Sequence, residues 1–328
     1  MRRIMKWLVL GLAAVVLVLG VGFARAHWAV RQERAPLPGA DALWAMPSSD
    51  GPVSLAMINT ASQTMPRGAV LEPNVDPRPD DPYIMSHPSF VLQWADGRML
   101  LVDAGMNRDQ ALSFGRPLEW AAGAEAIQPH QSVAEQLGAQ AQNVKGVVFT
   151  HLHTDHVGGI TDLCQRVGHP LRVPMTPAQA FRPNYTTQPG LDLIAASQCA
   201  QVEPLSPASP AALAAFPGVV VLAAGGHTPG SQIIVAFVRG AHGVTPYVFA
   251  GDIANNIDGI SNDIPKPFLY SLLMVPEDGE RLGELRRYLR GLRDSQGAVV
   301  LVSHDQQHLE GSGVPAWTGA ARLVERSS

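Results

Sequence analysis

Cysteine is nearly absent from this chain of 328 residues, which contains only Cys164 and Cys199. Neither cysteine lies in a CxxC pair or beside paired histidines, so the sequence excludes a cysteine-based zinc site. In an exported protein the two cysteines can form a disulfide bond, because oxidising compartments preserve such bonds. Two separate buried thiols are the alternative, and the sequence leaves this choice open.

Charged residues are also few, at 16%, and no run of basic residues follows the N-terminal region. Residues 1–26 contain four of the 24 basic residues and none of the 28 acidic ones, so the rest of the chain has a net charge of −8. Binding to a phosphate backbone needs a positive surface, so nucleic acid is excluded as a partner. The hydrophobic share of 46% suits a large globular core rather than a disordered chain.

The longest apolar run lies at the N-terminus. Basic residues precede it and a small-x-small site follows it: Arg2, Arg3 and Lys6, then Trp7 to Phe23, then Ala24-Arg-Ala26. This pattern predicts that residues 1–26 are a secretory signal peptide, cleaved after Ala26. Because the run is almost long enough to cross a bilayer, the alternative is an uncleaved inner-membrane anchor through residues 4–23. Both interpretations place the folded domain in the periplasm or outside the cell.

The remaining chain is expected to contain one domain. Residues 27–50 are rich in proline and alanine and aperiodic, which predicts a linker leading into the domain. Residues 51–328 contain no strong break and no short-period repeat, so they are predicted to form a single catalytic domain. Residues 204–213 are predicted to form a surface loop.

Five short apolar runs end abruptly in polar residues. Each has the length and β-branched composition of a buried strand, and they are Met99–Val102, Val147–Thr150, Val219–Leu222, Tyr247–Ala250 and Val299–Val302. Ser132 is predicted to cap a short helix. A longer helix is expected from about Pro276 to Ser295, with a leucine stripe facing the core and Arg286 off that stripe. Polar residues at the carboxyl ends of strands are typical of sites in α/β folds.

The segment His151-Leu-His153-Thr-Asp155-His156 is the most informative part of the chain. It offers four metal-binding side chains, and imidazole with carboxylate suits a borderline ion such as zinc. Neighbouring side chains point in different directions, so a single metal is not expected to bind all four. The spacing therefore favours two metals side by side, each of which needs further ligands.

Three other residues supply those ligands: His227 in a Gly/Pro turn, Asp252 and His304 after strands. One metal is predicted to take His151, His153 and His227, and the other Asp155, His156 and His304, with Asp252 bridging. Each metal then keeps an open position for catalysis, and a hydroxide held between the metals is the expected nucleophile. The cofactors are thus two divalent ions, with zinc expected and manganese, iron or cobalt also compatible.

Other polar residues receive a different interpretation. Asp103 is predicted to orient a ligand histidine through its second ring nitrogen. Isolated histidines carry no motif and are interpreted as surface or core residues, namely His27, His87, His130, His169 and His242.

The chain resembles the metallo-β-lactamase superfamily over about residues 50–310. The resemblance lies in five segments: Val102-Asp-Ala-Gly105, Thr150 to Gly159, Gly226-His-Thr-Pro-Gly230, Gly251-Asp252 and Ser303-His304. It implies an α/β fold of the four-layer αββα sandwich type, built from two similar halves, with a dinuclear site at one edge of the sheets. It also implies the ligand set given above.

Within that superfamily, Leu101 to Met106, Ser303 to Gln306 and the insertion at about 107–143 resemble N-acyl-homoserine lactonases and their organophosphate-hydrolysing relatives. Asp252 differs from true β-lactamases, which generally lack the bridging carboxylate. The lactonases often carry a tyrosine three residues after that aspartate, and this chain has Asn255 there. The resemblance implies a hydrolase of small-molecule esters, above all lactones, in which Asp155 passes a proton to the leaving alkoxide.

Four alternatives remain open from the sequence. They are a phosphoester or sulfate-ester hydrolase, a β-lactamase, a mononuclear iron dioxygenase and a non-catalytic domain tethered to a membrane. The walls of the substrate pocket are expected from residues 104–130, 176–200 and 253–275, whose apolar side chains favour an acyl-bearing substrate.

Overall fold

The computed structural model describes residues 2–46, 49–206, 209–241 and 243–319, so His242 lies outside the described residues. The elements follow in the order α1 (Arg2–Arg31), α2 (Ala40–Trp44), β1 (Ser54–Pro66), η1 (Arg67–Ala69), β2 (Pro82–Gln93), β3 (Met99–Val102), α3 (Arg108–Ala121), β4 (Gln128–Pro129), α4 (Val133–Leu137), η2 (Gly138–Asn143), β5 (Val144–Val148), α5 (Thr154–Val157), α6 (Ile160–Val167), β6 (Leu171–Met175), α7 (Pro177–Phe181), α8 (Gln188–Ala196), β7 (Ala200–Pro204), β8 (Ala211–Ala212), β9 (Val219–Ala223), β10 (Gln232–Gly240), β11 (Gly243–Phe249), η3 (Gly251–Ile253), α9 (Ile257–Ser261), η4 (Tyr270–Met274), α10 (Gly279–Gln296), β12 (Val299–Leu301) and α11 (Gln306–Gly311).

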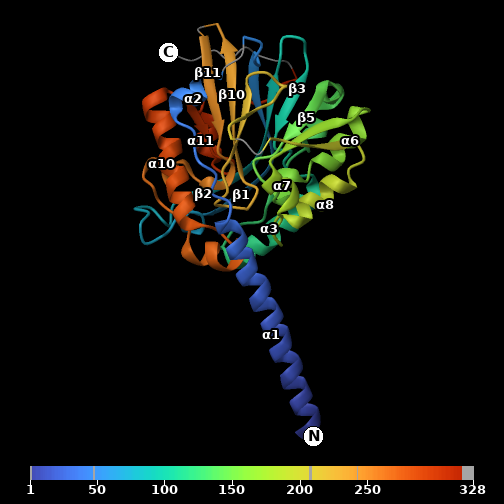
Figure 1. Ribbon diagram of the computed structural model, residues 1–328, viewed down its shortest axis with the longest axis vertical. Helices are drawn as coiled ribbons and strands as arrows, with labels where there is room; N and C mark the ends of the chain where they lie inside the picture. The colour runs from blue at the N-terminus through green and yellow to red at the C-terminus, as the bar shows by residue number, and fades with distance from the viewer. Residues whose placement is uncertain (1, 47–48, 207–208, 242, 320–328) are drawn as a thin grey trace.

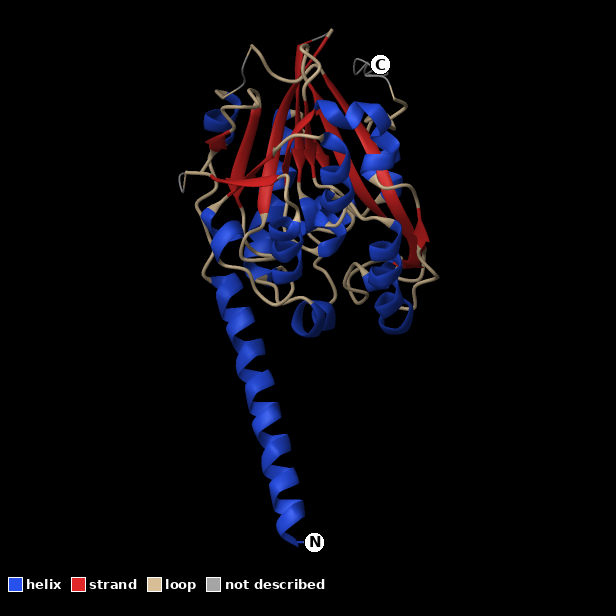
Figure 2. Cartoon of the chain, turned by 90° about the vertical axis from the view of Figure 1, so that its right-hand side faces the viewer, coloured by secondary structure: helices blue, strands red, loops and turns tan. Residues whose placement is uncertain are grey.

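Two β-sheets pack face to face between helices (Figures 1 and 2). The strand orders are β4-β1-β2-β3-β5-β6-β7 and β12-β11-β10-β9-β8. Buried side chains from both sheets, such as Phe90 and Phe249, form the central core. A second core lies between the first sheet and helices that include α4 and α6, and a third lies between the second sheet and α10. The predicted four-layer α/β sandwich is therefore confirmed.

Two parallel strand pairs position the polar residues that follow them. In the first sheet, β3 and β5 are parallel with Val102 opposite Val148, so both strands end at the same edge. In the second sheet, β11 and β12 are parallel with Phe249 opposite Leu301. The predicted strands are confirmed as β3, β5, β9, β11 and β12, although β5 ends at Val148, two residues early.

The predicted helix near the C-terminus is confirmed as α10, and its leucine stripe is buried. Arg286, which the periodicity places off the stripe, is nevertheless buried and donates from Nε to Asp263 Oδ1 at 2.9 Å. Helical periodicity alone misses this position because α9 and the residues after it pack beside α10 and supply the carboxylate.

The N-terminal helix α1 continues without a break past Ala26 to Arg31. Residues 5–31 are long and apolar enough to cross a membrane, which suits either an anchor or a signal sequence. Within residues 27–50, predicted from composition as a linker, the structure places the end of α1 and helix α2. Leu43 of α2 is fully buried against the second sheet, so part of this segment belongs to the core of the domain.

Cys164 of α6 and Cys199, just before β7, form a disulfide bond. This resolves the choice that the sequence leaves open. The bond ties the helical layer over the first sheet to the edge of that sheet, and bonds of this kind persist in oxidising compartments.

Candidate metal centre

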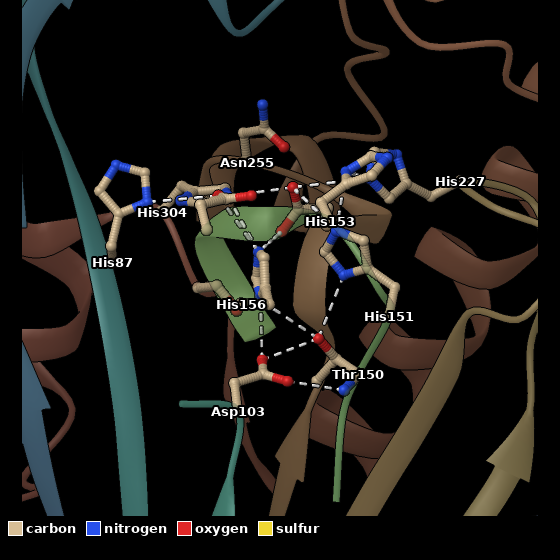
Figure 3. A network of polar contacts seen from close by, with 12 residues as sticks. His87, Asp103, Thr150, His151, His153, His156, His227, Asn255 and His304 are labelled. Atoms are coloured by element: carbon tan, nitrogen blue, oxygen red, sulfur yellow. Dashed lines mark hydrogen bonds and ion pairs between the residues drawn. The ribbon is translucent and has the colours of Figure 1, made fainter. Parts of the chain in front are cut away.

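The histidine-rich segment begins directly after β5. His151 lies outside any helix or strand and His153 is extended, and the chain then enters the single turn of α5, which carries Asp155 and His156. The alternation of extended backbone and helix turns all these side chains toward one edge of the sandwich. Figure 3 shows the rings of His151, His153 and His156 facing those of His227 and His304.

A close approach of backbone explains the glycine at position 159, three residues after His156. A Cβ atom at Gly159 would lie 2.1 Å from the carbonyl oxygen of Ala104, which no side chain tolerates. The Gly159 amide donates to the Gly105 carbonyl at 2.9 Å. Gly159 therefore lets the α5 region contact the turn that follows β3, where the Ala104 amide donates to the His156 carbonyl at 2.7 Å, next to Asp103.

Three histidines and one carboxylate form the first cluster. His153 Nδ1 lies 3.0 Å from His151 Nε2 and 3.2 Å from His227 Nε2. Asp252 Oδ2 lies 3.6 Å from His227 Nε2. The ligand atoms of these four residues all lie within 4.8 Å of one another, a spacing that can hold one metal ion.

The second cluster shares Asp252 with the first. His304 Nε2 lies 3.0 Å from Asp252 Oδ2 and 3.4 Å from Asp155 Oδ2. His156 Nε2 lies 3.3 Å from Asp252 Oδ1 and 3.5 Å from Asp155 Oδ2. All seven residues singled out from the sequence thus meet at one place. Their division between two metals stays a prediction, because His156 groups with Asp252 and His304, whereas Asp155 groups with His87 and His304.

The chemistry of these side chains fits divalent cations. Burial lowers the pKa of His151 well below its ordinary value and that of His153 to about 3, so both rings offer neutral lone pairs. Burial opposes charge on Asp252, but the neighbouring histidines outweigh it and hold its pKa well below the ordinary range. Asp252 Oδ1 is buried without a hydrogen-bond partner among the described residues, as expected of an oxygen reserved for a metal.

Asp103 orients His156 from behind, as the sequence predicts. Its Oδ2 accepts from His156 Nδ1 at 2.8 Å. The backbone amide of Thr150 donates to Oδ1 at 2.7 Å and its hydroxyl to Oδ2 at 2.8 Å. Asp103 itself has a φ of 59°, an uncommon conformation for a residue other than glycine. The contacts in Figure 3 fix the ring so that Nε2 faces the second cluster.

Glu277 supports His227 in the same way, although no sequence motif marks it. Its Oε1 accepts from His227 Nδ1 at 2.6 Å and from Lys266 Nζ at 2.7 Å, and all three side chains are buried. Burial would raise the pKa of Glu277, but Lys266 and His227 outweigh it and lower the value to about 2. The carboxylate therefore stays charged and holds His227 with Nε2 toward the first cluster.

Replacing Glu277 by glutamine is expected to weaken metal binding at the first cluster by about 10–100-fold, because a neutral amide orients His227 less firmly. Competition with a chromogenic chelator measures this affinity in the purified chain. The matched control is Glu280→Gln, three residues further on in the first turn of α10, whose side chain is 74% exposed. Equal affinities in both variants would contradict the supporting role of Glu277.

His87 was interpreted as one of the isolated surface or core histidines. It is a core residue, but the structure places it beside the site. The side chain is buried, its Nδ1 lies 3.3 Å from Asp155 Oδ2, and its ring contacts Phe114 edge-on. Burial lowers the pKa of His87 to about 4, so the ring is neutral. No local pattern marks this residue, because the pairing of β2 with β1 and β3 brings it to the centre.

A cavity of about 590 Å³ opens onto both clusters, where His153, Asp155, Asp252 and His304 form its floor. Its walls are largely apolar and include Met65, Val70, Met85, Phe114, Leu118, Leu269, Leu273 and Met274. The three expected wall segments all contribute. The β1 and β2 residues were not expected, because those strands carry no polar motif.

A comparison of the sequence with models of protein families identifies the family of the chain. A model of the metallo-β-lactamase superfamily matches residues 84–304. The chain therefore belongs to the metallo-β-lactamase superfamily. No curated protein matches it in a sequence search.

Solved structures share the fold at low sequence identity. A variant of AiiA from B. thuringiensis, with N-decanoyl-L-homoserine bound at the active site, is 15% identical with a TM-score of 0.57, covering 80% of this chain and 96% of its own. A probable metal-dependent hydrolase from Staphylococcus aureus is 18% identical with a TM-score of 0.53, covering 79% and 91%. AidC, a dizinc quorum-quenching lactonase, is 14% identical with a TM-score of 0.51, covering 78% and 89%.

Proposed function

We propose that this protein is an exported, dinuclear metal-dependent hydrolase that opens lactones or cleaves other carboxylic esters. The observation that carries the proposal is an apolar cavity whose floor is formed by two metal-binding clusters that share one carboxylate, Asp252. A long apolar wall suits an acyl group, and the polar floor suits the ester bond. The similarity to lactonase structures supports the same substrate class.

The residues that would hold the ions are His151, His153 and His227 on one side, and Asp155, His156 and His304 on the other, with Asp252 between them. Two bound divalent ions, with zinc expected, would polarise the ester carbonyl and activate a water molecule as the nucleophile. Asp103, Glu277 and the Ser86 carbonyl, which accepts from His304 Nδ1 at 2.7 Å, keep the ligand rings oriented.

Asp155 is the residue that moves the proton. Burial opposes its charge, but His156, His87 and His304 outweigh burial and hold its pKa below the ordinary value. The carboxylate faces the cavity, so it can accept the proton of the attacking water. As the bond between the carbonyl carbon and the leaving oxygen breaks, Asp155 returns that proton to the alkoxide. The product is a hydroxy acid in the case of a lactone.

Tyr270 supplies the phenol hydroxyl that the sequence lacks at position 255. Asn255 occupies the expected tyrosine position, but Tyr270 of η4 lines the same cavity together with Asn255 and Asp252. Burial and the carboxylates of Glu277 and Asp252 raise the pKa of Tyr270 well above its ordinary value, so the phenol stays protonated. A protonated phenol at this position can donate a hydrogen bond to the substrate carbonyl.

Tyr270→Phe is expected to lower kcat by about 10–100-fold while KM changes little, since a hydrogen bond that strengthens as the carbonyl gains charge acts on the transition state. Steady-state kinetics on a lactone separate the two parameters. Tyr185→Phe is a matched control, because Tyr185 is half exposed and does not line the cavity. A rise in KM alone would instead assign Tyr270 to ground-state binding.

A combined metal and substrate assay tests the proposed function. We expect about two metal ions per chain and hydrolysis of acyl-homoserine lactones, γ-lactones or aryl esters. Chromogenic phosphate and sulfate esters and nitrocefin test the phosphoesterase, sulfatase and β-lactamase alternatives. About one iron per chain would favour a dioxygenase, and the absence of turnover on every lactone and ester would overturn the proposal.

A further inference from the structure

We propose that the mouth of the catalytic cavity rests on the lipid bilayer that α1 spans, and that substrates with long acyl chains enter directly from the lipid. The surface that contacts the bilayer, here named the rim, comprises Trp120 at the end of α3 and the segment Phe268 to Met274. The substrate part of this inference rests on the proposed ester hydrolysis, whereas the docking of the rim does not.

The contacts of α1 favour a retained anchor over a cleaved signal peptide. A peptidase needs an accessible, extended site, yet α1 stays helical through Ala26, where cleavage would occur. Ala26 and Val30 are both buried against the domain. The chain that follows is also fixed, because Arg34 forms a bidentate ion pair with Asp278 at 2.7 and 2.8 Å.

The length of α1 sets the height of the domain above the membrane. The apolar stretch from Trp7 to Phe23 has 17 residues and, at 1.5 Å per residue, spans about 25 Å, close to the hydrocarbon thickness of about 30 Å. His27 lies one turn beyond Phe23, about 6 Å further, within the headgroup layer. The domain therefore begins at the membrane surface, without a spacer.

The cavity mouth lies beside this exit point. His27 Nε2 is 3.1 Å from the carbonyl oxygen of Leu272 in η4. Leu269, Leu273 and Met274 of the same segment line the cavity. Figures 1 and 2 show α1 leaving the domain at the end where the helices around the site gather, opposite the β10–β11 hairpin. Anchoring by α1 thus brings the mouth, and not the far end, to the bilayer.

The rim is apolar where a surface facing only water would be polar. Trp120 is 91% exposed, Phe268 67%, Leu269 64% and Leu273 61%. Grouped apolar residues of this size mark an interaction surface, and exposed tryptophans such as Trp28 of α1 are enriched at membrane interfaces. Because the apolar cavity wall continues into the rim, an acyl chain can pass from lipid to the floor without crossing water.

Fluorescence quenching tests the docking without relying on activity. Cys164 and Cys199 are bonded to each other, so single cysteines introduced by Trp120→Cys, Phe268→Cys and the control Val244→Cys can be labelled selectively. Val244 is 48% exposed at the start of β11, at the far end of the domain. The full chain is reconstituted in phosphatidylcholine–phosphatidylglycerol vesicles with either lipid-attached doxyl groups or aqueous iodide.

We expect doxyl lipids to quench the labels at positions 120 and 268, and iodide to quench only the label at 244. Equal iodide quenching at all three positions would overturn the proposal. Labels at 120 and 268 that are shielded from both quenchers would mean that a protein covers the rim, which would overturn it as well.

Kinetics test the route of the substrate. Trp120→Gln with Phe268→Gln changes the rim but not the cavity lining, and Val202→Gln with Val244→Gln is the control pair of exposed residues. On a long-chain acyl lactone dissolved in vesicles, the rim variant is expected to lose at least about tenfold in kcat/KM, as two aromatic side chains no longer enter lipid. Its rate on a short, water-soluble lactone should not change.

An equal rate on the vesicle substrate in rim and control variants would overturn entry from the lipid. If the unaltered chain hydrolyses neither lactone, the proposed function fails, while the quenching experiment still decides whether the rim is docked.

Discussion

Replacing Asp155 by alanine is expected to lower kcat on a lactone by at least about 1000-fold without unfolding the chain. A positioned proton-transfer group contributes about 100–10,000-fold, and Asp155 also belongs to the second metal-binding cluster. The side chain is buried between His87 and His304, at 3.3 and 3.4 Å from their nitrogens. Removing it therefore affects proton transfer and metal binding together. Steady-state kinetics measure the loss, and circular dichroism checks the fold.

Asp155→Asn separates these two contributions. The amide keeps one oxygen as a ligand but cannot carry the proton, so we expect nearly normal metal content with a large loss of kcat. Asp192→Ala, an exposed aspartate on α8, is the control and should retain full activity. Turnover by Asp155→Ala close to that of this control would show that the reaction does not need the carboxylate.

The parts of the site that were predictable from the sequence share one physical property. Asp103, His151, Asp252 and His304 follow short apolar runs that form strands, and parallel pairing of β3 with β5 and of β11 with β12 brings their ends to one edge. A strand can be recognised from the residues within it. In an α/β fold the ends of parallel strands then meet at one edge of the sheet. The sequence alone therefore predicts that these four side chains gather at one edge.

The supporting residues were not predictable because their roles depend on long-range packing. Glu277 meets His227 across 50 positions of the chain, and Lys266 joins them from a segment without a motif. His87 lies inside β2, where its neighbours give only a strand pattern. Tyr270 lies in a short segment between α9 and α10 that has no periodicity. In each case the sequence shows a single polar residue, and only the tertiary fold provides its partner.

Composition also fails to predict the contacts of the segment after the N-terminal helix. Its proline and alanine content predicts a linker, since such composition lacks a regular apolar face. Leu43 is nevertheless fully buried beneath the second sheet, and Arg34 pairs with Asp278 at the start of α10. Leu37, Trp44 and Met46 pack against the same core. The segment is attached by these scattered contacts, because the rest of the domain already provides the surface that receives them.

Asp252→Asn is expected to reduce the metal content from about two ions per chain to one or fewer and to lower turnover by at least about 100-fold. Among the described residues, Asp252 alone belongs both to the cluster with His227 and to the cluster with His156. Its Oδ2 lies 3.6 Å from His227 Nε2 and its Oδ1 lies 3.3 Å from His156 Nε2. An amide has the same shape but no charge and only one oxygen, so it can serve at most one cluster. Elemental analysis after dialysis against metal-free buffer measures the ions.

The control for this substitution is Asp294→Asn, a change of the same size at a side chain that is 52% exposed on α10. It should keep two ions and full turnover. If Asp252→Asn also keeps two ions, each cluster binds its metal without a shared carboxylate, and the sites act as independent centres. If it keeps one ion, the retained ligands can be identified by comparing His227→Ala with His304→Ala, since only the cluster that still binds metal will respond.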